Sequence, residues 1–307
     1  MRPLGALRLP LLLAAGATAL ASCGGGSGTG VIKADGSSTV GPFTTKAAED
    51  WKAAGGSDVT VGISGTGGGF ERFCAGETDI SNASRAIKDE EATICADNGV
   101  EYIELQVATD ALTNVVNSEN QWTTCLTVEQ LNAIWEPGSK VSNWNQVDPS
   151  YPDVPLKLYG AGTDSGTFDY FTDVVNGEEG ASRSDFSATE DDNVTVQGVA
   201  GDKGALGYFG FSYFEENQDT LKALEVDGGD GCVAPSVAAA QDGSYAPLSR
   251  PLFMYVKTSS LAATEGLTEF LRYMLENEQT IAEEARFVPL SQEQIDAELQ
   301  KLEDASS

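Results

Sequence analysis

Strand-like and helix-like runs alternate along the chain from residue 31 onward, and this alternation limits the fold more than any other feature. Val31–Ala34 and Val59–Ile63 are rich in β-branched and apolar residues, as is typical of buried strands. Between them, Thr44–Ala54 has apolar residues at helical spacing. Regular alternation of this kind favours open, mostly parallel sheets with helices on both faces. We therefore predict an α/β fold, and the length of 307 residues suggests two domains.

Composition excludes several classes of function. The chain has no histidine, so it cannot form a Ser-His-Asp triad, a Cys-His dyad or an imidazole metal site. Its 47 Asp and Glu residues against 18 Lys and Arg residues give a formal net charge of −29. Because nucleic-acid backbones are bound by dense clusters of Lys and Arg, we expect no nucleic-acid partner. We also expect no cofactor and no metal, and we interpret the excess acid as a solvated surface that aids solubility.

The first 22 residues have the order of a secretory signal peptide. Two arginines precede the apolar run Leu9–Leu20, and small residues follow it. The run ends in Leu-Ala-Ser-Cys at residues 20–23, which resembles the bacterial lipobox, where cleavage precedes a cysteine that receives a diacylglyceryl group. We predict a signal peptide over residues 1–22, then an acylated Cys23 and a flexible tether over 23–30. The predicted protein is extracytoplasmic or periplasmic, and the lipid is its only contact with the membrane.

Four cysteines remain once the predicted lipidation site is set aside. An even number of cysteines in an exported protein favours disulfides over thiol chemistry. Four cysteines allow three pairings. We favour Cys74 with Cys95, because their short separation would close a helix-loop unit within one domain. By elimination, Cys125 would then pair with Cys232.

Three loops of small residues each follow a predicted strand and precede a predicted helix. Their glycines let the backbone turn with its N–H groups exposed, their hydroxyl groups add donors, and the next helix presents its positive end. A single loop of this kind is more often only a helix cap, but three would converge on one edge of a sheet, where open α/β proteins bind ligands. The pattern predicts a site for a tetrahedral oxyanion. The loops are Asp35–Gly41, Ser64–Gly69 and Gly160–Thr167.

A fourth turn, Asp79–Arg85, adds a positive charge. Arg85 follows Ser84, and the planar guanidinium group matches an oxyanion bidentately. The alternative is a surface ion pair between this arginine and Glu90 or Glu91. We favour contact with the anion, because the chain has so few cations.

Several stretches together resemble the PstS family, the substrate-binding lipoproteins of phosphate ABC transporters. The run Gly-Ile-Ser-Gly-Thr-Gly-Gly-Gly-Phe at residues 62–70, followed by 79–85, is similar to a branch found in cyanobacteria and other bacteria. The resemblance covers nearly all of residues 31–256. Further matching stretches are Leu158–Phe171, Ala181–Arg183 with Glu190–Asn193, Gln197–Phe211 and Leu248–Tyr255.

The resemblance implies a type II periplasmic-binding-protein fold with one phosphate in a cleft between two lobes. Lobe I would comprise residues 31–113 and 253–307, and lobe II residues 114–252. Two crossover strands, which we place near Leu112–Val116 and Pro251–Val256, would form the hinge. The implied function is high-affinity binding of inorganic phosphate outside the cytoplasm and its delivery to ABC permease subunits. The protein would be a monomer without enzymatic activity.

The family's phosphate donors, carried over residue by residue, fall in the three small-residue loops. Ser84 lies where better-known members place a carboxylate that accepts the phosphate proton, and Ala161 lies where they place an arginine. We hypothesise that Arg85 supplies the missing cation, with Arg183 as a weaker second candidate. Asp164, or another nearby carboxylate, would supply the missing acceptor. The matching donors are Ser38, Thr39, Thr66, Ser165, Gly166 and Thr167.

Two other functions fit parts of this pattern. A secreted phosphatase using Ser165 would need a base, and the sequence has neither histidine nor a visible metal cluster. A binding protein of the same shape for sulfate, molybdate or a phosphonate is the second alternative. An ionised acceptor would separate phosphate from sulfate, because a carboxylate that faces a proton-free oxyanion meets only lone pairs.

Overall fold

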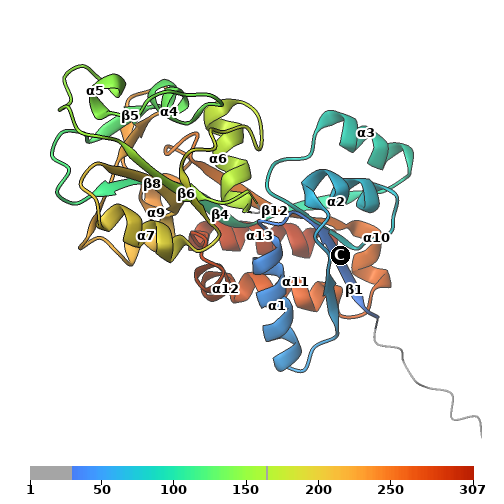
Figure 1. The fold of residues 1–307 in the computed structure, drawn as a ribbon. Coiled ribbons are helices and arrows are strands. Elements are labelled where there is room, and N and C mark those ends of the chain that lie inside the picture. The colour runs from blue at the N-terminus through green and yellow to red at the C-terminus, as the bar shows by residue number, and fades with distance from the viewer. Residues whose placement is uncertain (1–29, 164) are drawn as a thin grey trace, which may run out of the picture.

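The computed structural model describes residues 30–163 and 165–307. It has two α/β lobes that lie side by side (Figure 1). One lobe combines the blue N-terminal segments with the orange and red C-terminal helices, and the other contains the green and yellow middle of the chain. The predicted two-lobed α/β fold is therefore confirmed.

The strands alternate with helices as the sequence predicts, and the first three strands pair in parallel. The strands are β1 (Ile32–Gly36), β2 (Val59–Val61), β3 (Ile80–Ala83), β4 (Tyr102–Asn117), β5 (Cys125–Thr127), β6 (Lys157–Ala161), β7 (Ser187–Thr189), β8 (Ala205–Gly210), β9 (Leu221–Ala223), β10 (Glu225–Asp227), β11 (Cys232–Val233) and β12 (Ser249–Lys257). Over the described part of the chain, nine of them form one sheet in the order β2-β1-β3-β12-β4-β8-β6-β7, with β9 paired to β4. A smaller sheet has the order β11-β10-β5.

Two long antiparallel strands, β4 and β12, join the lobes. β4 pairs with β12 as far as Ala111, and from Leu112 onward it pairs with β8 and then also β9. The crossover strands predicted near Leu112–Val116 and Pro251–Val256 lie within β4 and β12. Each lobe thus shares its sheet with the other through this pair of strands.

Helices cover the sheet, and each lobe has its own hydrophobic core. Phe43 and Phe270 are fully buried in the core of lobe I, and Trp135 and Phe171 are fully buried in that of lobe II. The helices are α1 (Gly41–Ala53), α2 (Gly65–Cys74), α3 (Asp89–Asp97), α4 (Val128–Trp135), α5 (Trp144–Val147), α6 (Gly166–Asn176), α7 (Asp192–Ala200), α8 (Phe211–Glu215), α9 (Val237–Gln241), α10 (Thr258–Ala263), α11 (Leu267–Glu276), α12 (Glu278–Glu284) and α13 (Gln292–Ala305). None of the helices described is long and apolar enough to cross a bilayer.

Helix α2 begins earlier than the sequence predicts. The pattern indicates a loop over Ser64–Gly69 and a helix from Phe70, whereas the helix starts at Gly65. Its glycines allow close packing on β1, because a Cβ atom at Gly69 would lie 2.6 Å from the Cα atom of Gly36. The N-terminal half of α2 therefore packs against the end of β1 and the loop that follows it.

Both predicted disulfides are confirmed. Cys74 is bonded to Cys95, which ties α2 to α3, and Cys125 is bonded to Cys232, which ties β5 to β11. The predicted signal peptide and the predicted lipidation site at Cys23 lie outside the described residues, as does all of the tether except Gly30.

Candidate functional site

A cavity of about 730 Å³ lies between the lobes. Lobe I contributes the loops after β1 and β3 and the start of α2, and lobe II contributes one face of α6. The start of β12 and the residue two positions before it also line the cavity, through Pro247, Ser249, Arg250 and Pro251. The volume lies in the range of small-molecule pockets. The predicted site residues that line this cavity are Ser38, Thr39, Thr66, Ser84, Arg85 and Gly166.

The loop after β1 is held rigidly from behind. Asp35 is almost fully buried, and one of its oxygens accepts a bond of 2.6 Å from Arg72. Gly36 has a φ of +135°, and a Cβ atom there would lie 2.2 Å from the carbonyl oxygen of Asn82, so only glycine fits. Ser37 accepts hydrogen bonds from the two backbone N–H groups of Thr39 and Val40. These contacts present Ser38 and Thr39 to the cavity.

Two hydroxyl groups meet at the N-terminus of α2. The hydroxyl oxygens of Thr66 and Ser84 lie 3.1 Å apart, and the backbone N–H of Ser84 donates to the Thr66 hydroxyl at 3.2 Å. Two of the predicted site residues, one from α2 and one from the turn after β3, are thus brought into direct contact. Free N–H groups of a helix N-terminus and nearby hydroxyl groups suit an anionic ligand.

The third loop comes from lobe II and meets the first loop across the cavity. Ser165 caps α6, because its hydroxyl accepts from the backbone N–H of Thr167 at 3.2 Å. A Cβ atom at Gly166 would lie 2.6 Å from the hydroxyl oxygen of Thr39. The loops of the two lobes therefore converge as predicted. Asp164, the predicted proton acceptor, lies outside the described residues.

Arg250 is the cavity arginine that sequence reasoning missed. It lines the cavity, and its Nη2 atom donates to the Thr39 hydroxyl at 3.3 Å. Its Nε and Nη2 atoms each lie 3.2 Å from one oxygen of Asp110, its partner in the β4–β12 register. The guanidinium carbon is 3.8 Å from the ring centre of Tyr170. Burial raises the pKa of Asp110 and the charge of Arg250 opposes this shift, so the two groups depend on each other.

Arg85 also lines the cavity, but its guanidinium group is already paired. Its two terminal nitrogens donate to the two oxygens of Glu91 at 2.8 and 2.7 Å. That hydrogen bond is the main reason why the pKa of Arg85 is raised. One of the two contacts weighed from sequence, the ion pair with Glu91, is therefore present, and the side chain still borders the cavity.

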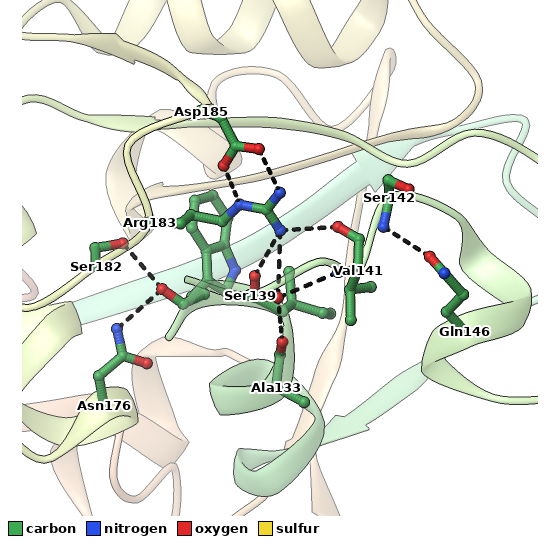
Figure 2. A network of polar contacts seen from close by, with 11 residues as sticks. Ala133, Ser139, Val141, Ser142, Gln146, Asn176, Ser182, Arg183 and Asp185 are labelled. Carbon is green, nitrogen blue, oxygen red and sulfur yellow. Dashed lines mark hydrogen bonds and ion pairs between the residues drawn. The ribbon is translucent and has the colours of Figure 1, made fainter. Parts of the chain in front are cut away.

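Arg183 lies away from the other predicted residues and does not line the cavity. Figure 2 shows its guanidinium group among polar partners in lobe II. It pairs with Asp185 at 2.6 and 2.9 Å and donates to the carbonyl oxygens of Ile134 and Val141. Through these contacts the buried arginine stabilises the end of α4 and the segment that follows it.

Three carboxylates of lobe II line the same cavity as the small-residue loops of lobe I. Asp169 and Asp173 lie one turn apart on α6, and Glu179 follows that helix. Burial and the nearby charge of Glu179 raise the pKa of Asp169, whereas Arg250 lowers it. The sequence pattern gave no sign of these residues beyond their helical spacing on one face.

One group of potential metal ligands occurs among residues 30–163 and 165–307. Cys125, Glu225 and Cys232 place their ligand atoms within 4.8 Å of one another. The two sulfur atoms are bonded to each other, so neither offers a thiolate to a metal.

The chain is similar to known proteins over most of its length. The family model described as PBP superfamily domain matches residues 23–278. Protein SphX of Synechocystis sp. is 47% identical over 265 residues, which is 85% of this chain and 79% of that protein. The phosphate-binding protein PstS of Staphylococcus saprophyticus is 41% identical over 294 residues, which is 93% of this chain and 90% of that protein.

A solved structure is similar to this chain in fold as well as in sequence. The crystal structure of a possible phosphate binding protein from Planctomyces limnophilus matches with a TM-score of 0.86 at 45% identity, covering 91% of this chain and 99% of that one. Sequence and fold therefore agree over both lobes.

Proposed function

Because this chain belongs to the PstS family of the periplasmic-binding-protein superfamily, we propose that it binds inorganic phosphate outside the cytoplasm and delivers it to an ABC-type importer. The observation that carries the proposal is the convergence of donors from both lobes on one cavity, where the Thr39 hydroxyl lies against Gly166 and accepts from Arg250. Phosphate accepts hydrogen bonds through all four of its oxygens, and the presence of donors from both lobes at one cavity supports the proposal.

Phosphate would be held by hydroxyl groups, by backbone N–H groups at the starts of α2 and α6, and by Arg250 and Arg85. Charge-assisted hydrogen bonds contribute about 1.5 to 3 kcal/mol each. The net charge of −29 acts mainly from the surface, where salt screens it beyond about 8 to 10 Å. Short-range donors in the cleft therefore outweigh it. The proposed ligand residues are Ser38, Thr39, Thr66, Ser84, Arg85, Ser165, Gly166, Thr167 and Arg250.

Binding would close the two lobes about β4 and β12, with boundaries near residues 113 and 253. The cavity of about 730 Å³ is far larger than one phosphate ion requires, given that a water molecule occupies about 30 Å³ in the liquid. Closure would remove this excess volume and exclude water, and the closed form would be the one recognised by the permease.

Isothermal titration calorimetry with phosphate and sulfate tests the function directly. We expect one phosphate per chain and no sulfate binding at neutral pH. Incubation with a chromogenic phosphate ester should give no turnover, because we infer a binding protein without catalytic activity. Turnover would support the alternative of a phosphatase, and equal binding of sulfate or molybdate would support that of a general oxyanion-binding protein.

We propose Asp169 as the carboxylate that accepts the phosphate proton, with Asp164 as the other candidate. Asp169 lines the cavity one turn beyond Gly166. Replacing it with Asn would supply a donor in place of an obligate acceptor, so sulfate should bind at least tenfold more tightly than to the wild type. Asp173→Asn, one turn further along α6, is the matched control and should leave sulfate rejection intact. If only Asp164→Asn admits sulfate, Asp169 is not the acceptor.

We also propose that the mature chain is a monomer anchored by a lipid on Cys23. The Leu-Ala-Ser-Cys sequence at residues 20–23 and the preceding apolar run support this. A diacylglyceryl group is an adequate anchor by itself. The intact mass of the protein extracted from membranes should show the lipid, and Cys23→Ser should remove it.

A further inference from the structure

Charged side chains of opposite sign line the two walls of the cavity without an ion-pair partner. Lys88 extends from lobe I at the start of α3, and Asp173 and Glu179 belong to lobe II. All three are exposed. Within the described part of the chain, none of them takes part in an ion pair or a side-chain hydrogen bond. Unpaired charges that face the same cavity from different lobes are electrostatically complementary.

Glu179 lines the same cavity as Arg85 and Lys88, which lie close together in one turn of lobe I. After the dominant hydrogen bond with Glu91, the charge of Glu179 also contributes to the raised pKa of Arg85. Arg85 precedes Lys88 by three residues in the same turn, but its terminal nitrogens are held by Glu91. The charge of Lys88 also helps to lower the pKa of Glu91, but its ammonium group forms no ion pair with that carboxylate, so Lys88 is the cation of this turn that we take to meet lobe II.

The wall of lobe I next to this turn also lacks a packing partner. Gly67 lies in the first turn of α2, and a Cβ atom there would meet nothing within 4 Å. Glycine inside a helix is less favourable than alanine by about 1 kcal/mol. In the present arrangement of the lobes, no neighbouring atom requires a glycine at this position. A glycine here would be useful if lobe II or the ligand came close to this surface.

From these observations we propose that Lys88 and Glu179 form an ion pair across the mouth of the cleft when the lobes close. The inference rests on the proposed binding and closure. Both would be positioning residues, because they hold the closed state and do not contact phosphate. An ion pair formed only after the ligand is enclosed slows ligand release and leaves the encounter rate unchanged. For a partly exposed pair the effect on the dissociation rate should be about two- to fivefold.

Stopped-flow measurements of phosphate association and dissociation test the pair. Lys88→Gln and Glu179→Gln should each raise the dissociation rate about two- to fivefold, and the double variant should show no further increase, since both changes remove one interaction. The association rate should stay within twofold. The exchanged pair Lys88→Glu/Glu179→Lys should restore the wild-type dissociation rate. Glu178→Gln is the matched control, because Glu178 is exposed, adjacent in sequence and absent from the cavity wall.

Several outcomes would overturn the proposal. Additive effects of the two single changes, or failure of the exchanged pair to restore the rate, would mean that the residues do not interact. Slower release from Glu179→Gln would mean that the carboxylate repels the bound anion. Small-angle scattering of the wild type distinguishes failure of this proposal from failure of the proposed function. If phosphate binds without making the molecule more compact, the proposed closure and the ion pair are both wrong, whereas the proposal of phosphate binding is unaffected.

Discussion

Replacement of Arg250 by Gln is expected to weaken phosphate binding by about 2 to 4 kcal/mol, or roughly 30- to 1000-fold. Arg250 is the cavity cation whose guanidinium group is flanked by both lobes, through Thr39 on one side and Tyr170 on the other. Its charge is largely withdrawn from solvent, since 18% of the side chain is exposed. A fixed cation in a water-excluding site contributes more than a solvated one. Calorimetry on the purified variant measures the loss.

Two further variants identify the cause of that loss. Arg250→Gln leaves Asp110 buried without its partner, which alone destabilises the fold. In the double variant Asp110→Asn/Arg250→Gln, stability should recover while phosphate binding stays weak. Recovery of binding together with stability would show that Arg250 acts only by holding β4 and β12. Arg85→Gln should lose less affinity than Arg250→Gln, because Glu91 already occupies the Arg85 guanidinium.

The second large effect concerns stability at alkaline pH. Glu278 is fully buried, one of its oxygens accepts from the backbone N–H of Leu290, and the other has no partner. Burial raises the pKa of Glu278 to about 8 from an ordinary 4.5. The native state therefore retains a proton that the unfolded chain releases. Consequently the free energy of unfolding should fall as the pH rises from about 4.5 and level off above about 8.

Glu278→Gln should remove this dependence, because the amide resembles the protonated acid and does not ionise. At pH 9 we expect the variant to be more stable than the wild type by up to about 4 kcal/mol, and at pH 4.5 the difference should be small. Urea unfolding at the two pH values measures both. Glu276→Gln, at an exposed site on α11, is the control and should change neither value. Equal effects of Glu278→Gln at both pH values would show that the pKa of Glu278 is not raised in the native protein.

Local patterns predicted the elements and the loops of the site, because the physics of those features is local. Glycines and hydroxyl residues between a strand and a helix determine where the backbone turns, and Thr39, Thr66 and Gly166 accordingly lie at the cavity. The disulfide between Cys74 and Cys95 follows from a short separation in the chain.

Arg250 was missed because its environment depends on the register of two distant strands. It lies 140 residues from Asp110, and only the pairing of β4 with β12 places the two side chains opposite each other. The available signal was a rare cation directly before the predicted crossover strand. For Arg85, the sequence could not decide between Glu91 and the anion, because both partners are within reach of one flexible side chain.

The pairing of Arg250 with Asp110 has a mechanical consequence. These residues are paired in the ladder between the two strands about which the lobes would rotate, and the same guanidinium group lines the cavity between the lobes. A substitution of Arg250 would therefore change both the cation that we propose to contact phosphate and the pairing of the two strands that join the lobes, so ligand affinity and the ease of closure would be coupled at this position.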